Sequence, residues 1–324
     1  MATAQELRDL GISTFRAGVW KPRTYPGNFE GRGEEALPWL QKVQEELGMK
    51  VAIEVATPLH VATALRYGIK IFWIGARTTA NPFAVQAIAD ELAQALPAAD
   101  GIRLLVKNPT SPDLDLWIGA IERFRKSGVK NITAVHRGFS AYEKTEYRNQ
   151  PMWQLAMDFR RRMPDVPLYC DPSHIGGKRE LIQPLSQKAL DLGFDGLMIE
   201  SHYCPDKALS DADQQLTPQE LGQMIDSLTV RDSNTAAEGL DILRKQIDEL
   251  DSQLIDIVER RMMVSKEIGQ YKKQHNLTVF QSGRYKEVLE RLIALAQKKG
   301  IDKRCAKLIF EAIHEESVRQ QLEN

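Results

Sequence analysis

The first 227 residues repeat one pattern, in which a short apolar run is followed by a longer amphipathic segment. The runs that we predict as strands are Ser13–Trp20, Lys50–Val55, Ile71–Ala76, Arg103–Lys107, Ile132–His136, Leu168–Cys170 and Gly196–Ile199. Helix-like segments such as Glu34–Leu47 and Asp113–Ser127 stand between them. Strands that alternate with helices pair in parallel and are covered on both faces. An open doubly wound sheet and a closed barrel both fit this alternation.

Polar or charged residues follow almost every predicted strand. They are Lys21, Arg23, Arg77, Lys107, Arg137, His174 and Glu200. A barrel gathers all of its strand C-termini around one mouth, where its chemistry lies, whereas an open sheet spreads them along an edge. The pattern therefore favours a (β/α)8 barrel. Only seven strands are visible, because the chain opens directly on a helix at Ala2–Leu10, so we expect the first strand of the barrel to be absent from this chain.

The expected barrel mouth carries an unusual number of cations. They are Arg16, Lys21, Arg23, Arg77, Lys107 and Arg137, with His136 expected beside them. Arginine forks bind phosphate and carboxylate in a bidentate manner, and lysine adds a point charge. Because so many like charges are costly to hold together without an anion, the pattern predicts one or two small substrates with several phosphate and carboxylate groups. The alternative is that these are ordinary solvated loop charges.

Six side chains at or after two consecutive strand ends could hold a divalent cation. They are Asp171, His174, Glu200, His202, Asp206 and Asp211. Imidazole and carboxylate groups on adjacent loops suit Mn²⁺, Fe²⁺, Co²⁺ or Zn²⁺. The alternative is a satisfied core histidine with ordinary helix caps.

The composition limits the partners of the chain. A net charge of −1 argues against a broad nucleic-acid or membrane surface, so any phosphate site must be local. The sequence has no apolar run of about eighteen residues and no secretory signal. Cys170, Cys204 and Cys305 show no metal or disulfide spacing, so a reducing cytoplasm is the expected location.

The pattern changes after residue 227. Residues 228–237 are polar and lack periodicity, which predicts a linker between a barrel (1–227) and an all-helical domain (238–324). Apolar residues then alternate at spacings of three and four, the seam of a coiled coil, at positions 240, 243, 247, 250, 254, 257, 264, 268 and 271. Such a long helix cannot be covered by the two shorter ones predicted after it. We therefore expect a homodimer through the helical domain.

One seam position is an arginine, Arg261, and Lys272 lies on the same stripe. A charged seam residue either fixes the register or clamps a ligand. Arg244 borders the seam about 25 Å earlier along the helix, too far to share a small ligand within one protomer. An antiparallel partner would bring its Arg244 to Arg261 and Lys272, which predicts a dianion pocket shared between protomers.

The motifs of the first region resemble those of the 3-deoxy-D-arabino-heptulosonate 7-phosphate (DAHP) synthases, in the compact microbial branch of the type I enzymes. They are RAGVWKPRT (16–24), IGAR (74–77), VKN (106–108), HRG (136–138), DPSH (171–174) and IESH with ALSD (199–211). The resemblance implies a (β/α)8 barrel and a metal-dependent, aldol-like reaction. Phosphoenolpyruvate joins erythrose 4-phosphate, water attacks, and inorganic phosphate leaves.

The resemblance also implies roles for single residues. Phosphoenolpyruvate would be held by Arg16, Lys21, Arg77, Lys107 and Arg137. Lys21 is also the candidate proton donor, and Arg23 with Thr24 would contact erythrose 4-phosphate. His174, Glu200 and Asp211 match three of the four metal ligands of the family, and the metal would polarise the sugar aldehyde as a Lewis acid.

The fourth ligand of the family is a cysteine in a Gly-Pro-Cys motif on the first strand, and it has no counterpart here. We therefore expect that Met1 is an internal methionine and that a natural N-terminal segment is omitted. This exact chain is expected to bind metal poorly and to condense its substrates slowly or not at all.

Residues 243–272 and ESVRQQ (316–321) resemble an all-helical chorismate mutase. The resemblance implies that the two carboxylates and the ether oxygen of chorismate are held by the partner's Arg244 and by Arg261, Lys272 and Arg284, with Ser317 and Gln321 completing the pocket. Arg261 and Lys272 would be the catalytic cations of a rearrangement to prephenate that needs no cofactor. Gln281 and Tyr285 stand where an acidic pair is common, and the glutamate that Tyr285 replaces is a contact for a substrate hydroxyl.

The two resemblances together predict a bifunctional shikimate-pathway enzyme of aromatic amino-acid biosynthesis, with feedback by prephenate through the C-terminal domain. One alternative is a related barrel that makes another sugar acid, such as 3-deoxy-octulosonate or sialic acid. Another is that the helical domain only dimerises and binds an effector.

Overall fold

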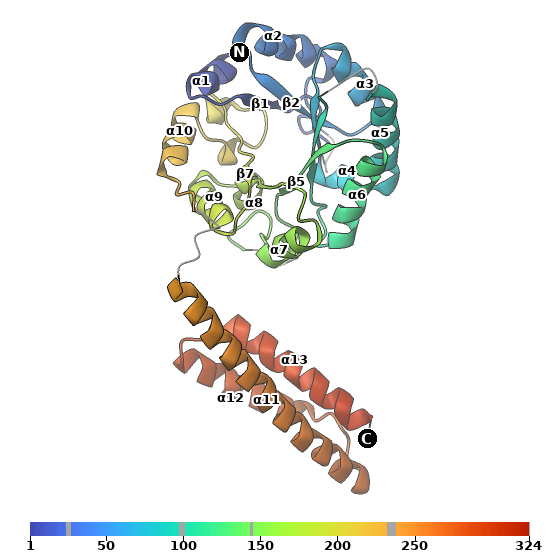
Figure 1. Ribbon diagram of the computed structural model, residues 1–324, viewed down its shortest axis with the longest axis vertical. Helices are drawn as coiled ribbons and strands as arrows, with labels where there is room; N and C mark the ends of the chain where they lie inside the picture. Colours follow the sequence, from blue (N-terminus) through green and yellow to red (C-terminus); the bar gives the residue numbers. More distant parts are fainter. Residues whose placement is uncertain (24–26, 97–100, 143–144, 232–237, 324) are drawn as a thin grey trace. The chain divides into compact units, whose positions relative to one another are not determined.

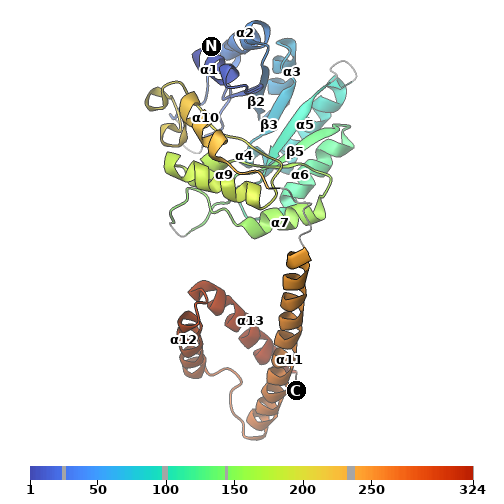
Figure 2. The same cartoon turned by 60° about the vertical axis from the view of Figure 1, so that its left-hand side comes forward.

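The computed structural model describes residues 1–23, 27–96, 101–142, 145–231 and 238–323. The chain divides into two compact units, Met1–Ser233 and Asn234–Asn324 (Figures 1 and 2). The first unit is a mixture of strands and helices, and the second is helical. Among the described residues, no helix is both long enough and apolar enough to cross a membrane.

The first unit is built on one sheet of seven parallel strands, each paired with the next in the chain. The strands are β1 (Thr14–Ala17), β2 (Lys50–Val55), β3 (Ile71–Ile74), β4 (Arg103–Lys107), β5 (Asn131–His136), β6 (Leu168–Cys170) and β7 (Gly196–Leu197). The sheet curls into a partial barrel, with β1 and β7 as its two outermost strands (Figure 1). The predicted fold class is confirmed, since the described residues form seven parallel strands of a curled (β/α) barrel and a helical region follows them.

Helix α1 precedes the strands, the other helices follow them, and the longer ones cover the outer face of the sheet (Figure 1). They are α1 (Ala2–Asp9), α2 (Leu37–Leu47), α3 (Pro58–Arg66), α4 (Ala76–Thr79), α5 (Pro82–Ala95), α6 (Leu114–Lys126), α7 (Trp153–Arg162), α8 (Pro172–Gly176), α9 (Ile182–Asp191) and α10 (Pro218–Ser227). Short 3-10 turns stand at Gly33–Ala36, Arg179–Leu181, Pro205–Lys207 and Ala212–Gln214.

Local sequence explains where these helices begin. Asp113 accepts a hydrogen bond from the backbone N–H of Leu116 at 2.9 Å, which caps α6. Thr217 and Glu220 form a capping box at the start of α10. In the outer core, the indole of Trp117 stacks on Phe159 and donates a hydrogen bond to the carbonyl of Val106 at 3.1 Å, which ties α6 to α7 and β4.

The alternation of side chains along the strands decides which residues reach the barrel interior. Ile53 of β2 packs in the outer core, whereas its neighbour Ala52 packs in a small inner cluster with Trp73 and Val135. Because successive side chains point to opposite faces, Glu54 points to the same inner side as Ala52. The last inward-facing residue of each strand therefore lies at the mouth, where all the strands end.

The second unit consists of three helices, α11 (Glu238–Gln274), α12 (Ser282–Lys298) and α13 (Lys303–Leu322). Helix α13 packs against both α11 and α12. Gly269 permits the close approach of α11 and α13, because a Cβ atom at this position would lie 3.0 Å from Cα of Gln321. Much of the apolar seam of α11 is exposed in the single chain, at Leu243, Ile247, Leu250, Leu254 and Ile257.

Candidate active sites

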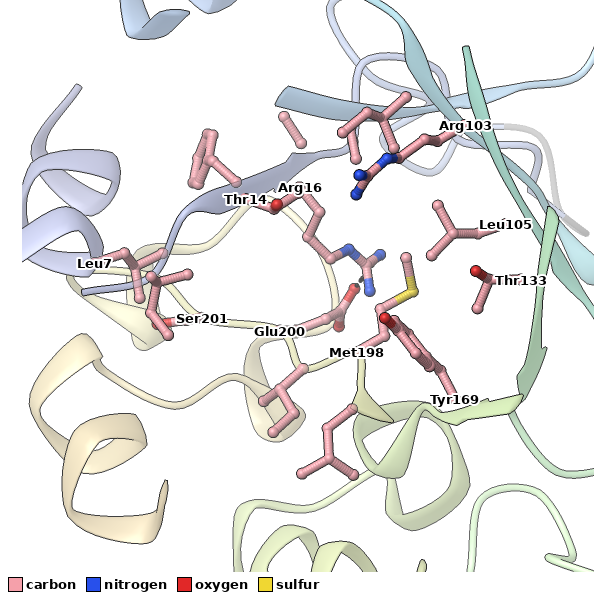
Figure 3. Close-up of a pocket in the computed structure, with 18 of the residues that line it drawn as sticks. Leu7, Thr14, Arg16, Arg103, Leu105, Thr133, Tyr169, Met198, Glu200 and Ser201 are labelled. Carbon is pink, nitrogen blue, oxygen red and sulfur yellow. Dashed lines mark hydrogen bonds and ion pairs between the residues drawn. The ribbon is translucent and has the colours of Figure 1, made fainter. Parts of the chain in front are cut away.

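The curled sheet holds a cavity of about 800 Å³, lined by β1, β7 and residues of the strands between them. Figure 3 shows Arg16, Tyr169, Met198 and Glu200 pointing into it. The guanidinium of Arg16 lies over the indole of Trp73, 4.7 Å from the ring centroid. Its lining combines apolar residues of the barrel interior, such as Leu105 and Met198, with the charged residues Lys21 and Glu200.

An ion cluster centred on Asp171 lies at the end of β6. Its Oδ2 atom is 2.7 Å from Nζ of Lys107, 3.9 Å from Nη1 of Arg16 and 2.9 Å from Nδ1 of His174. Its Oδ1 atom accepts a hydrogen bond from the backbone N–H of His174 at 3.0 Å, which caps α8. Arg16 also donates to Oε1 of Glu200 at 3.2 Å. Each of these cations therefore already has a carboxylate partner.

Burial and these ion pairs shift the pKa values in opposite directions. Burial alone raises the pKa of Asp171, but His174 and Lys107 more than offset it and hold the pKa well below its usual value. Burial lowers the pKa of Lys107, and Asp171 restores part of it. Burial also lowers the pKa of His174, against the opposing charge of Asp171. The carboxylate is thus ionised and fixed near neutral pH.

A second cluster surrounds Asp211 in the loop after β7. Its Oδ2 atom lies 3.2 Å from Nζ of Lys21 and 3.3 Å from the guanidinium of Arg23, and its Oδ1 atom accepts a hydrogen bond from Arg148 at 3.0 Å. Burial opposes ionisation of Asp211, but Lys21 and the hydrogen bond from Arg148 hold its pKa far below the usual value. Lys21 also contacts Oγ of Ser210 at 2.5 Å.

Arg137 lies buried at the end of β5. Its Nη1 atom donates a hydrogen bond to Oδ1 of Asn149 at 2.7 Å. Burial lowers its pKa to about 10, and the charges of Arg148 and Arg77 act in the same direction. His136, which we expected in the same group, instead packs with the aromatic rings of the outer layer, because Val135 occupies the inward position.

Glu54 is a site residue that the motif analysis missed. Burial raises the pKa of its carboxyl, with Lys107 and Arg16 opposing the rise. Gly75 leaves room for it, since a Cβ atom at that position would lie 2.0 Å from its Oε1. The inward alternation along β2 could have identified this carboxyl, because Glu54 stands two residues after the inward Ala52.

The predicted metal ligands are only partly grouped. The charges of Glu200 and His174 affect each other's pKa. The oxygens of Asp211, however, are bound by three cations. Across the described residues, no three His, Cys, Asp or Glu side chains are close enough to hold a metal ion. The donor types suit a divalent metal, but this arrangement does not. The remaining predicted contact, Thr24, lies outside the described residues.

The second unit brings four of its predicted site residues together between α11 and α13. Arg261 donates to Oγ of Ser317, and its Nη1 atom lies 3.4 Å from the carbonyl oxygen of Ile313. Lys272 donates to Oε1 of Gln321 at 3.1 Å. Burial lowers the pKa of Arg261. The result is a pair of cations with hydroxyl and amide groups beside them.

Two predicted arginines stand apart from this cluster in the single chain. Arg244 is exposed and pairs with Asp241 at 3.3 Å, and Arg284 is exposed and pairs with Glu287 at 2.9 Å. Each pair is formed within a single helix, the first in α11 and the second in α12. Their exposed positions leave both guanidinium groups available to another molecule.

Comparison with known proteins decides the family. Residues 1–236 match the DAHP synthetase I family. The chain belongs to the DAHP synthetase I family. Residues 243–322 match the family of type II chorismate mutases, so a chorismate mutase domain follows the DAHP synthase domain. The predicted families of both regions, and the presence of two enzyme domains, are confirmed.

Relatives of the DAHP synthase domain are known in other organisms. A phospho-2-dehydro-3-deoxyheptonate aldolase of Thermotoga maritima is 31% identical over 238 residues, which cover 71% of this chain and 67% of that protein. A 2-dehydro-3-deoxyphosphooctonate aldolase of Nitratidesulfovibrio vulgaris is 26% identical over 65% of this chain and 78% of its own length.

Solved structures agree with the fold. A crystal structure of the DAHP synthase from Thermotoga maritima aligns with a TM-score of 0.60 and 29% identity, covering 69% of this chain and 62% of that one. A truncated form of the synthase from the same organism aligns with a TM-score of 0.58 and 28% identity, covering 69% and 78%. This chain therefore spans less than two thirds of the first of these structures.

Proposed function

We propose that the chain catalyses two reactions of the shikimate pathway. The barrel would condense phosphoenolpyruvate with erythrose 4-phosphate to give DAHP and phosphate, and the helical unit would convert chorismate to prephenate. The observation that carries the first proposal is the convergence of Arg16 and Lys107 on Asp171 and of Lys21 and Arg23 on Asp211. The second rests on the cation pair of Arg261 and Lys272.

In the barrel, substrate anions would replace the two carboxylates as partners of the cations. Arg16, Lys107 and the buried Arg137, with Arg77 and Lys21, would hold phosphoenolpyruvate, and Arg23 with Thr24 would hold the sugar phosphate. Buried, pre-positioned cations stabilise charge that shifts through the enol phosphate more strongly than solvated ones do. Lys21, beside Ser210, is the proposed proton donor.

We further propose that the barrel reaction depends on a divalent metal, held by His174, Glu200 and Asp211. A bound Mn²⁺, Fe²⁺, Co²⁺ or Zn²⁺ would supply Lewis-acid activation of the aldehyde. To ligate it, Asp211 would have to exchange at least one of its three cationic partners. Weak metal binding is the expected consequence.

A pair of direct assays tests the two activities. The purified full chain, with Mn²⁺ added, is incubated with phosphoenolpyruvate and erythrose 4-phosphate, and phosphate release and DAHP are measured. Chorismate consumption is followed separately, without metal. Absence of prephenate at saturating chorismate would contradict the mutase half of the proposal. Because this chain is expected to condense its substrates slowly or not at all, absence of DAHP both here and in a chain extended by a Gly-Pro-Cys strand would contradict the synthase half.

The second unit is proposed to form a homodimer through the seam of α11. Leu243, Ile247, Leu250, Leu254 and Ile257 are each 51–62% exposed, and a contiguous apolar row of this kind marks an interaction surface. An antiparallel copy would bring its Arg244 to the cation pair.

Sedimentation should show a dimer that Leu250→Asp dissociates, with loss of chorismate turnover. Leu308→Asp, an exposed leucine of α13, is the matched control and should remain dimeric.

Feedback by prephenate is also proposed, because a late step of the pathway is fused to its first step. DAHP formation by the full chain is measured with and without prephenate, in the unchanged protein and in Arg261→Ala. Inhibition of the unchanged protein that Arg261→Ala abolishes would support feedback through the mutase pocket. Equal rates in all four conditions would exclude it.

A second candidate for the barrel is synthesis of an octulosonate phosphate, because relatives with that activity in their names are 26% identical to this chain. Both candidates use the same anion-binding cations and differ in the length of the aldehyde. A comparison of kcat/KM for erythrose 4-phosphate and arabinose 5-phosphate separates them. We expect the four-carbon sugar to be preferred.

A further inference from the structure

A histidine on α13 adjoins the candidate mutase site without having been assigned a role. The ring of His314 packs against Tyr285 of α12 in a tilted arrangement, with 4.3 Å between centroids and an angle of 33°, and meets Phe280 edge-on at 6.1 Å. His314 precedes Ser317 and Gln321 by one and two helical turns, so these three residues share one face of α13. The imidazole is thus held by aromatic neighbours beside the polar cluster.

The Nε2 atom of His314 is buried and has no hydrogen-bond partner among the described residues. Buried polar atoms in folded proteins are nearly always paired, and an unpaired one loses the free energy of its hydration. An unpaired nitrogen beside a substrate pocket is therefore a natural contact for a bound ligand. The charges of Arg261 and Lys272 act directly on this imidazole.

The electrostatic surroundings indicate which ligand group the imidazole would meet. Burial lowers the pKa of His314, and the nearby charges of Arg261 and Lys272 lower it further, so the ring is neutral near pH 7. The two cations bind a carboxylate more strongly than a neutral imidazole does, so the ring is not needed for the carboxylates of the substrate. It is well suited to a neutral hydroxyl, with which either tautomer forms a hydrogen bond.

We propose that His314 determines substrate specificity in the chorismate site through a hydrogen bond between its Nε2 atom and the ring hydroxyl of the substrate. This inference rests on the proposed mutase activity and deepens it. The resemblance to other mutases places a glutamate for that hydroxyl where Tyr285 stands. Here Tyr285 supports the imidazole by a tilted ring contact, and the histidine nitrogen takes the place of the missing carboxyl.

Substitutions in the full chain test the assignment by steady-state turnover of chorismate. His314→Phe keeps an aromatic ring against Tyr285 and removes the nitrogen, so kcat/KM should fall roughly 5- to 10-fold, as for loss of one neutral hydrogen bond. His314→Gln places an amide nitrogen nearby and should recover part of the loss. His275→Phe is the matched control, since His275 likewise contacts a tyrosine ring, that of Tyr271, but lies exposed just after the end of α11, and it should leave turnover unchanged.

A chorismate analogue in which hydrogen replaces the ring hydroxyl separates a direct contact from a structural role. Its inhibition constant is compared with that of a matched inhibitor that keeps the hydroxyl, in the unchanged chain and in His314→Phe. The unchanged chain should prefer the hydroxylated compound by roughly 5- to 10-fold, and His314→Phe should lose most of that preference.

Equal preference in both proteins, or full turnover by His314→Phe, would overturn the assignment. Circular dichroism first checks that each variant folds, and if His314→Phe does not, the inhibitor comparison is made with His314→Ala in the same way. Absence of chorismate turnover by the unchanged chain would refute the mutase function itself, and the role of His314 with it.

Discussion

The Nζ atom of Lys107 lies 2.7 Å from the Oδ2 atom of Asp171, and both side chains are almost completely buried. This pair joins the end of β4 to the end of β6 across the barrel mouth. It has two consequences. It fixes the geometry of the mouth before a ligand arrives, and it makes the stability of the barrel depend on a charge that the substrate would share.

Asp171→Asn should therefore destabilise the barrel. Asparagine can still cap α8, but it leaves the buried Lys107 without its main anion, and removal of one partner from a buried pair typically costs about 3–5 kcal/mol. Urea unfolding followed by tryptophan fluorescence measures this, since all five tryptophans lie in the first unit. Asp115→Asn, which breaks an exposed pair with Arg162, is the control and should change little. Comparable small losses in both variants would contradict the prediction.

The lowered pKa of Asp211 predicts a loss of barrel stability in acid. A folded-state pKa below the unfolded value of about 4 means that the unfolded chain takes up protons first as the pH falls. The stabilisation is fully present above that unfolded value and is lost as the pH falls below it. Because Asp211→Asn cannot titrate, the stability difference between the unchanged protein and this variant should shrink from pH 7 to pH 3. A constant difference across that range would count against the ion cluster.

Arg148 is expected to compete with metal for Asp211. It donates to Oδ1 of Asp211 at 3.0 Å, it is not among the residues assigned to either substrate, and its side chain is 46% exposed. The substitution Arg148→Ala leaves the Oδ1 atom of Asp211 available to a metal ion, and it removes one positive charge that would repel the ion. We expect the affinity for Mn²⁺, measured by titration calorimetry without substrates, to rise roughly 3- to 10-fold.

Arg160→Ala is the matched control for this experiment. It removes an arginine of similar exposure that pairs with Asp195 on the outer surface, so the affinity for Mn²⁺ should not change. Unchanged or weaker binding by Arg148→Ala would show that the carboxylate of Asp211 does not take part in holding the metal.

The fold could be predicted from the sequence because the alternation of apolar runs and amphipathic segments is regular. All seven predicted strands are present, although β1 ends at Ala17, earlier than the predicted Trp20, and β7 ends at Leu197 instead of Ile199. Apolar residues continue past both strand ends, so composition alone cannot show where the pairing with the neighbouring strand stops. Hydrogen bonding between strands sets those boundaries.

The candidate site was only partly visible in the sequence. The cations at the strand ends were identified, but their partners Asp171 and Asp211 were considered only as possible metal ligands, and the ion clusters depend on tertiary packing. Arg148 stands in a long loop without periodicity, so no pattern could place it beside Asp211. By contrast, His314 shares helical spacing with Ser317 and Gln321, and that spacing could have revealed it.

Arg261→Ala distinguishes a catalytic helical unit from one that only dimerises and binds an effector. The Arg261 side chain reaches across from α11 to Ser317 on α13, and it would meet the charge that develops at the breaking ether bond. Loss of one such preorganised contact typically lowers kcat about 10²- to 10³-fold. Arg260→Ala is the adjacent control, because within the described part of the chain Arg260 bonds to the carbonyl of Asp256 in its own helix turn, and it should keep full turnover. Sedimentation of both variants checks that the oligomeric state is retained.

If Arg261→Ala converts chorismate as fast as Arg260→Ala, the helical unit does not use this cation for catalysis. A helical unit that only dimerises and binds an effector would then explain the result better than a catalytic one.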